Sequence, residues 1–234
     1  MKYFVSVMLI LLFNLSFSLT REEIMITSSY FHSNVNEINA EIKKLSGKED
    51  DRAKKGILYL ALATQEPPVE KASANAIKTL EVFEKKNVEP LLKAYVAMAY
   101  SLGARDDKNP LMKMKYSDMA IKLFNKIVDE NPTDWYIRFL RGNTFSNFPE
   151  VFQVGSIAKS DFEFIRDLYE GKKENIGKSL MVTVYFYLGE FAKSEKQINK
   201  ALDFWKKAVA IAEENGIKTD AYKKAKARIK VFED

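Results

Sequence analysis

The sequence predicts an all-α protein built as an array of antiparallel helix hairpins. Ala, Lys, Leu and Glu are plentiful, whereas only nine Gly and six Pro are spread through 234 residues, and this composition favours helices. Past residue 50, apolar residues recur at helical spacing, and no stretch alternates with the period of two that is typical of a strand. Pro near helix starts and Asn-Gly at a helix end separate these stretches. We therefore expect about nine helices of roughly 12 to 20 residues, paired as hairpins.

Residues 1–18 predict a secretory signal peptide. Lys2 precedes an apolar run from Tyr3 to Phe13, and small serines lead up to a cleavage point after Ser18. The run is short for a membrane span of about 20 residues, although an uncleaved N-terminal membrane anchor stays open as the alternative. Because no second long apolar run follows, we expect an exported, soluble body that is periplasmic or secreted.

Residues 19–51 predict a single leading helix followed by a linker. Gly47 ends the helix, and the charged run 48–52 is interpreted as a turn. The apolar residues that define the helix by their spacing are Val35, Ile38, Ile42 and Leu45.

Residues 52–234 predict the helical repeat domain, and the last hairpin carries its clearest pattern. This pattern consists of Tyr185, Leu188, Gly189, Ala192, Ala201, Trp205 and Ala208. In order and spacing it resembles the tetratricopeptide repeat. We expect Gly189 and Ala201 to let the two helices approach closely, and Trp205 and Tyr185 to fill the space toward the neighbouring hairpins. Ala192 departs from the family, which prefers a large aromatic residue there.

Three earlier hairpins match the repeat less well. The second has Ala120, Phe124 and Ile127 at the right spacing, but residues 102–112 lengthen its connection. The third spans 134–170, and the first, 52–86, is the most degenerate. The resemblance covers about residues 52–214 and implies a right-handed superhelix of about four hairpins. A final helix over about 218–232 is amphipathic and resembles the cap that such an array needs.

The sequence offers little for catalysis, so a binding protein is expected rather than an enzyme. There is no Cys and a single His, His32, which leaves no thiolate or imidazole cluster for a nucleophile or a metal. No phosphate-binding or dinucleotide-binding motif is present. We expect no cofactor and no metal, and interpret the acid pairs Asp50-Asp51 and Asp106-Asp107 as solvated charges or helix caps.

The net charge of +5 is mild and predicts no nucleic-acid partner, because the chain lacks a basic stripe with aromatic residues to read bases. Basic residues are concentrated only near the C-terminus. We interpret them as the solvated face of the last helix, with an anionic partner surface as the alternative. They are Lys218, Lys223, Lys224, Lys226, Arg228 and Lys230.

In tetratricopeptide proteins the first helix of each hairpin lines the concave, ligand-binding side. The resemblance therefore implies a mixed aromatic and polar lining. The alternative for Phe139 and Phe186 is burial against neighbouring hairpins. The predicted ligand-binding or partner-binding residues are Met98, Ser101, Tyr136, Arg138, Phe139, Arg141, Asn143, Ser146, Phe186, Glu190 and Lys193.

Arg138 and Arg141 stand where the repeat pattern has apolar residues, one helical turn apart on one face. A buried guanidinium needs a partner, so one hypothesis is an internal salt bridge to Asp118, Asp161 or Glu163. The other is a fork for the carboxylate or phosphate of a ligand. Since residues 141–152 are also the most irregular part of the array, we expect the site in this hairpin.

Two functions remain open. The first is a non-catalytic extracytoplasmic scaffold or adaptor that binds a protein or peptide, such as a transporter component, on its concave surface. The alternative is a periplasmic solute-binding accessory of a transport system, which would hold a small anionic or hydrophobic ligand. The first rests on the common use of the fold, which is analogy. Helical arrays with exposed aromatic residues often self-associate, so an oligomer is an open alternative as well.

Overall fold

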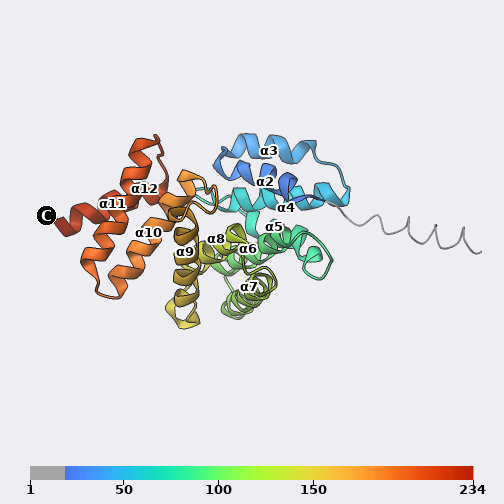
Figure 1. Cartoon of the computed structure of the whole chain (residues 1–234). Coiled ribbons are helices and arrows are strands. Elements are labelled where there is room, and N and C mark those ends of the chain that lie inside the picture. Colours follow the sequence, from blue (N-terminus) through green and yellow to red (C-terminus); the bar gives the residue numbers. More distant parts are fainter. Residues whose placement is uncertain (1–18, 234) are drawn as a thin grey trace, which may run out of the picture. The chain divides into compact units, whose positions relative to one another are not determined.

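The computed structural model describes residues 19–233, and these residues form helices without a strand (Figure 1). The predicted all-α fold is therefore confirmed for this part of the chain. The described residues divide into two compact units, one up to Asn131 and one from Pro132 on. The signal peptide predicted for residues 1–18 lies outside the described residues. In residues 19–233, every helix is too short or too polar to cross a membrane.

The first unit contains two helix pairs preceded by two short helices. Helix α4 packs on α5 and α6 packs on α7, while α5 also contacts α6; α2 and α3 both pack on α4. Short 3₁₀ turns follow α2 and α5. The helices are α2 (Arg21–Ser28), α3 (Val35–Lys44), α4 (Glu49–Ala63), α5 (Ala72–Leu80), α6 (Pro90–Asp106) and α7 (Pro110–Glu130).

The segment predicted as one leading helix is two helices. Thr20 caps α2 and Asn34 caps α3, each as part of a capping box with the glutamate three residues on. The Asn34 side chain accepts hydrogen bonds from the backbone N–H groups of Asn36 and Glu37. Ser33 is extended between the helices. The single-helix prediction was wrong because a strong cap at Asn34 starts a new helix.

Two predicted connections are also helical. The run 48–52 was predicted as a turn, but α4 begins at Glu49 and takes up its acids in the first turn, where the helix dipole favours negative charge. Hydrogen bonds from Ser46 to Asp51 lower the pKa of that carboxyl below its ordinary value. The long connection predicted at 102–112 is taken up by helix, since α6 extends to Asp106 and Pro110 starts α7.

The second unit contains two helix pairs and a final helix. Helix α8 packs on α9 and α10 packs on α11, while α12 contacts both α11 and α10 (Figure 1). From Glu49 to Glu233 nine α-helices follow one another, as predicted, although α5 and α8 are shorter than expected. The helices are α8 (Trp135–Phe145), α9 (Gly155–Glu170), α10 (Lys178–Ser194), α11 (Ile198–Glu214) and α12 (Asp220–Glu233).

Small residues bring paired helices together. A Cβ atom added at Gly189 of α10 would lie 2.3 Å from Nε1 of Trp205 on α11, so only glycine fits at this approach. Trp205 is fully buried and stacks on Phe232 of α12 with ring centroids 5.7 Å apart. Tyr185 is buried as well, and its hydroxyl donates to Glu170 of α9 over 2.8 Å. These contacts confirm the packing expected from the sequence pattern of the last hairpin.

Candidate functional site

A cleft of about 760 Å³ lies within the second unit. Its walls come from four places: the end of α8 with the loop that follows, the first half of α9, the second half of α10, and the middle of α12. Residues 145–150 supply one wall, so part of the irregular stretch singled out in the sequence does border a cleft.

The loop after α8 is fixed by its own hydrogen bonds and aromatic rings. The backbone N–H of Phe148 donates to the Phe145 carbonyl over 3.1 Å, which tightens the end of the helix. The Phe148 ring lies edge-on to Phe145 and to Phe152, with centroids 5.7 and 5.4 Å apart. Gln153 then takes the left-handed conformation, at φ 53°, and the chain enters α9. This wall of the cleft is consequently an ordered turn rather than an open loop.

Aromatic side chains make up most of the cleft's apolar lining. Phe145 and Phe186 are buried, whereas Tyr187 and Phe191 are partly exposed. The Tyr187 ring stacks on Phe162 of α9 with centroids 5.4 Å apart and planes 6° from parallel. Its hydroxyl oxygen accepts a hydrogen bond from Nδ2 of Asn147 over 3.1 Å, and burial raises the pKa of the Tyr187 hydroxyl. The stacking on Phe162 and the hydrogen bond from Asn147 together hold the Tyr187 ring in place.

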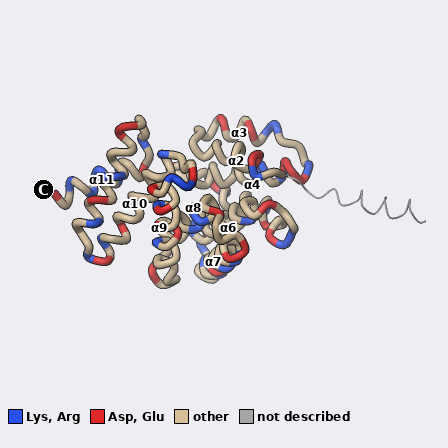
Figure 2. Tube along the Cα trace, in the orientation of Figure 1, with Lys and Arg blue, Asp and Glu red and all other residues tan. Residues whose placement is uncertain are grey.

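The cations of the cleft are neutralised within the molecule. Arg228 of α12 donates two hydrogen bonds to Glu190 of α10, at 2.9 and 3.0 Å. Lys159 pairs with Glu195, and Lys224 pairs with Asp220 over 2.6 Å. Figure 2 shows basic and acidic residues interspersed along the helices of the second unit.

Two carboxylates of the cleft have no such partner. Glu150, in the turn after α8, is exposed, and Glu163 on α9 is partly buried. Among residues 19–233, neither side chain forms a hydrogen bond or an ion pair. The cleft therefore combines an aromatic lining, several serine hydroxyls and two unpaired negative charges.

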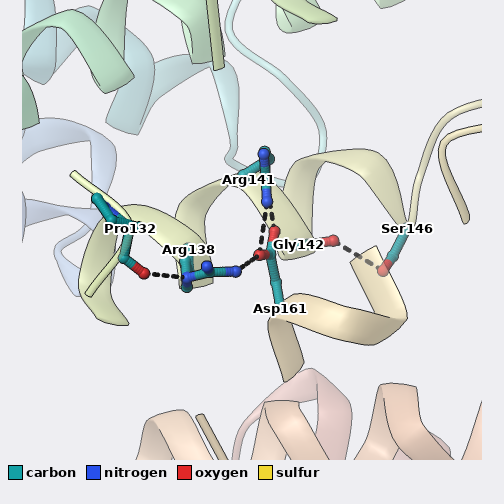
Figure 3. A network of polar contacts seen from close by, with 6 residues as sticks. All are labelled: Pro132, Arg138, Arg141, Gly142, Ser146 and Asp161. Atoms are coloured by element: carbon teal, nitrogen blue, oxygen red, sulfur yellow. Dashed lines mark hydrogen bonds and ion pairs between the residues drawn. The ribbon is translucent and has the colours of Figure 1, made fainter. Parts of the chain in front are cut away.

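Arg138 and Arg141 do not line this cleft; both bind Asp161 of α9 (Figure 3). Nε and Nη2 of Arg141 donate to the two oxygens of the carboxylate over 2.7 and 2.8 Å. Nη1 of Arg138 donates to Oδ1 over 2.8 Å, and its Nε donates to the Pro132 carbonyl. Asp161 is fully buried. This is the internal salt bridge that the sequence offered as one hypothesis, with Asp161 as the partner.

No family model, curated protein or solved structure matches this chain. Its function is therefore inferred from its own side chains.

The predicted site residues fall into three groups. Ser146, Phe186 and Glu190 line the cleft. Met98 and Ser101 lie on α6 in the first unit, where both are partly buried. The third group lies in the second unit but does not line the cleft, and its members are Tyr136, Arg138, Phe139, Arg141, Asn143 and Lys193.

Most side chains of the third group contact other parts of the unit. Phe139 packs against Phe162 with centroids 6.4 Å apart, and Tyr136 stacks on Phe139. Lys193 lies 3.5 Å from Glu190. Phe139 therefore follows the burial alternative, whereas Phe186 is both a core residue and part of the cleft wall.

Sequence reasoning missed Tyr187, Phe191 and Glu163, as well as the whole contribution of α12. Tyr187 and Phe191 are one helical turn apart and therefore share a face of α10, and this spacing could have pointed to them. Nothing local to the sequence indicates that Arg228 reaches Glu190, because that contact depends on how α12 folds back on α10.

The arrangement is equipped for binding. It offers apolar contact, neutral hydrogen bonds and ionic contact to a cation. Within residues 19–233, no group of three His, Asp or Glu side chains converges in the manner of a metal site.

Proposed function

We propose that this chain is an exported, non-catalytic adaptor whose paired helices form a tetratricopeptide-like superhelix. It binds an extended segment of a partner protein in the cleft lined by α8, α9, α10 and α12. The single observation that carries the proposal is the cleft itself. It is open along three helices and is lined by aromatic rings interleaved with serine hydroxyls.

That lining suits an extended peptide. Partly exposed rings such as Tyr187 and Phe191 provide area for alternate side chains of a bound segment. Ser156, Ser160 and Ser194 are exposed along the walls and can donate to or accept from peptide groups. A rigid aromatic wall loses little conformational entropy on binding, which favours affinity.

The sequence of residues 1–18 supports export. The order of neighbouring helix pairs, and the close approach of α10 and α11 at Gly189, support the superhelix. The solute-binding alternative relied on Arg138 and Arg141 as an anion fork. Since both guanidinium groups bind Asp161, no specific observation favours it.

The test is a selection from displayed random peptides of about ten residues, followed by titration of the enriched peptides against the purified full chain. Ser160→Trp fills the cleft from an exposed position of α9 that makes no side-chain hydrogen bond. Asn199→Trp, exposed on α11 outside the cleft, is the matched control. We expect Ser160→Trp to weaken binding at least about tenfold and Asn199→Trp to leave it unchanged. A failure to enrich any peptide, or equal losses in the two variants, would overturn the proposal.

A further inference from the structure

The charged side chains of the cleft favour a positively charged occupant. Every cation in its walls contacts a carboxylate of the same unit: Lys159 with Glu195, Arg228 with Glu190, and Lys224 with Asp220. Glu150 and Glu163 stay without such a contact among the described residues. The cleft thus carries two carboxylates without an ion pair, although the net charge of the chain is +5.

Glu163 is the more telling of the two carboxylates. It is partly buried on α9, two residues from Asp161, which is fully buried and binds two arginines. Glu163 lies in the same helix but turns into the cleft instead of joining this network. A carboxylate with reduced access to water and without an ion pair gains more from an incoming positive charge than a fully solvated one does.

The aromatic rings of the same cleft favour the same partner. Tyr187 and Phe191 are partly exposed in the cleft, and ring faces attract ammonium and guanidinium groups. The alkyl part of a long basic side chain can lie on such rings while its charged end reaches a carboxylate.

We propose that the occupant of this cleft is a protein segment that presents a lysine or arginine side chain to Glu163 and Glu150, with an apolar residue beside it on the aromatic wall. The inference rests on the proposed peptide-binding function and specifies the chemistry of the partner. Arginine is favoured over lysine, since its planar group both stacks on rings and donates two parallel hydrogen bonds to a carboxylate.

The probes are four pools of short acetylated and amidated peptides. Their central residue is arginine, lysine, norleucine or glutamate, and their other positions are drawn from the same mixture of leucine, phenylalanine, serine and alanine. Binding to the full chain is followed by fluorescence anisotropy at low and at high salt. We expect the basic pools to bind about three- to tenfold more tightly than the norleucine pool at low salt, and this preference to shrink as salt rises.

Variants then assign the preference to the two carboxylates. Glu163→Gln and Glu150→Gln should together bring the basic pools down to the affinity of the norleucine pool without abolishing binding. Glu214→Gln, which removes an exposed charge on α11 outside the cleft that likewise forms no ion pair among residues 19–233, should leave the preference intact.

The outcomes separate the two proposals. If all pools bind equally and Ser160→Trp weakens them all, the cleft binds peptides but the inferred charge preference is wrong. The charge preference is equally wrong if the glutamate pool binds best, or if the preference survives both glutamine substitutions. If no pool binds, or Asn199→Trp weakens binding as much as Ser160→Trp does, the proposed function fails and the charge preference fails with it.

Discussion

Removing the charge of Asp161 should destabilise the second unit severely. In Asp161→Asn the Arg141 guanidinium, whose side chain is 8% exposed, keeps at most one hydrogen bond to the side chain at position 161, through the amide oxygen, and loses the ion pair without regaining water. Breaking a buried pair by removing one partner costs about 3–5 kcal/mol. Arg138 is 18% exposed and keeps the Pro132 carbonyl and the Phe164 ring, so it adds little more. The expected loss is about 4 kcal/mol, roughly a thousandfold in the folding equilibrium.

The assay is urea unfolding followed by tryptophan fluorescence. Trp135 and Trp205 are the two tryptophans of the chain, and both belong to the second unit, so their emission reports that unit alone. Glu163→Gln, with the same change of charge on the same helix, is the control and should stay within about 0.5 kcal/mol of wild type. A loss below about 1 kcal/mol for Asp161→Asn would refute the reasoning, because it would mean that water or another group replaces the carboxylate.

A further variant distinguishes two causes of the instability of Asp161→Asn: a buried charge without an ion pair, and altered packing. Replacing all three members together, as Arg138→Met, Arg141→Met and Asp161→Leu, leaves no charge in the interior. This triple variant should be more stable than Asp161→Asn, since apolar replacement of a whole buried network is often neutral or stabilising. If it is equally unstable, the cost in Asp161→Asn comes from altered packing instead.

Two further changes test the packing and the pH dependence of the same unit. Gly189→Ala places a methyl group 2.3 Å from the buried Trp205 ring. The cost of overpacking, about 3 kcal/mol, should outweigh the gain in helix propensity of about 1 kcal/mol. Gly155→Ala, where the nearest atom would lie 3.9 Å away, is the control and should be neutral or stabilising in the same unfolding assay. The ammonium group of Lys207 lowers the pKa of Glu170 below its ordinary value near 4.5, so the stabilisation is present above that value and is lost as the pH falls. Wild type should therefore lose more stability than Glu170→Gln between about pH 5 and about pH 3, and parallel losses in the two proteins would contradict the assignment.

The helix pairs were predictable because helices are encoded locally. Apolar spacing and the prolines at positions 90 and 110 mark where the helices lie and begin, and Gly189 with Trp205 marks a close approach. The errors also arose from local signals. The cap at Asn34 was overlooked, and the acids after Lys48 were interpreted as a turn although a first helical turn accommodates them equally well.

The site was less predictable, because a cleft depends on contacts between distant segments. The irregular stretch after Arg141 pointed to the hairpin that borders the cleft, but Arg138 and Arg141 could not be assigned from sequence alone. Three acids were candidate partners, and only the folded arrangement selects Asp161. The cleft wall formed by α12 includes the salt bridge between Arg228 and Glu190, which joins residues 38 positions apart.

The buried arginine–aspartate network also limits how α8 and α9 can align. Apolar side chains tolerate a slip of one helix along another, since one leucine can replace another in a contact. If α9 slipped by one turn along α8, Asp161 would move away from Arg138 and Arg141, and the ion pairs that compensate its buried charge would be lost. The pair thus has one permitted register. In a chain of similar helical hairpins, pairing of a helix with the wrong neighbour is a characteristic folding error. The ion pairs to Asp161 favour α9 as the partner helix of α8.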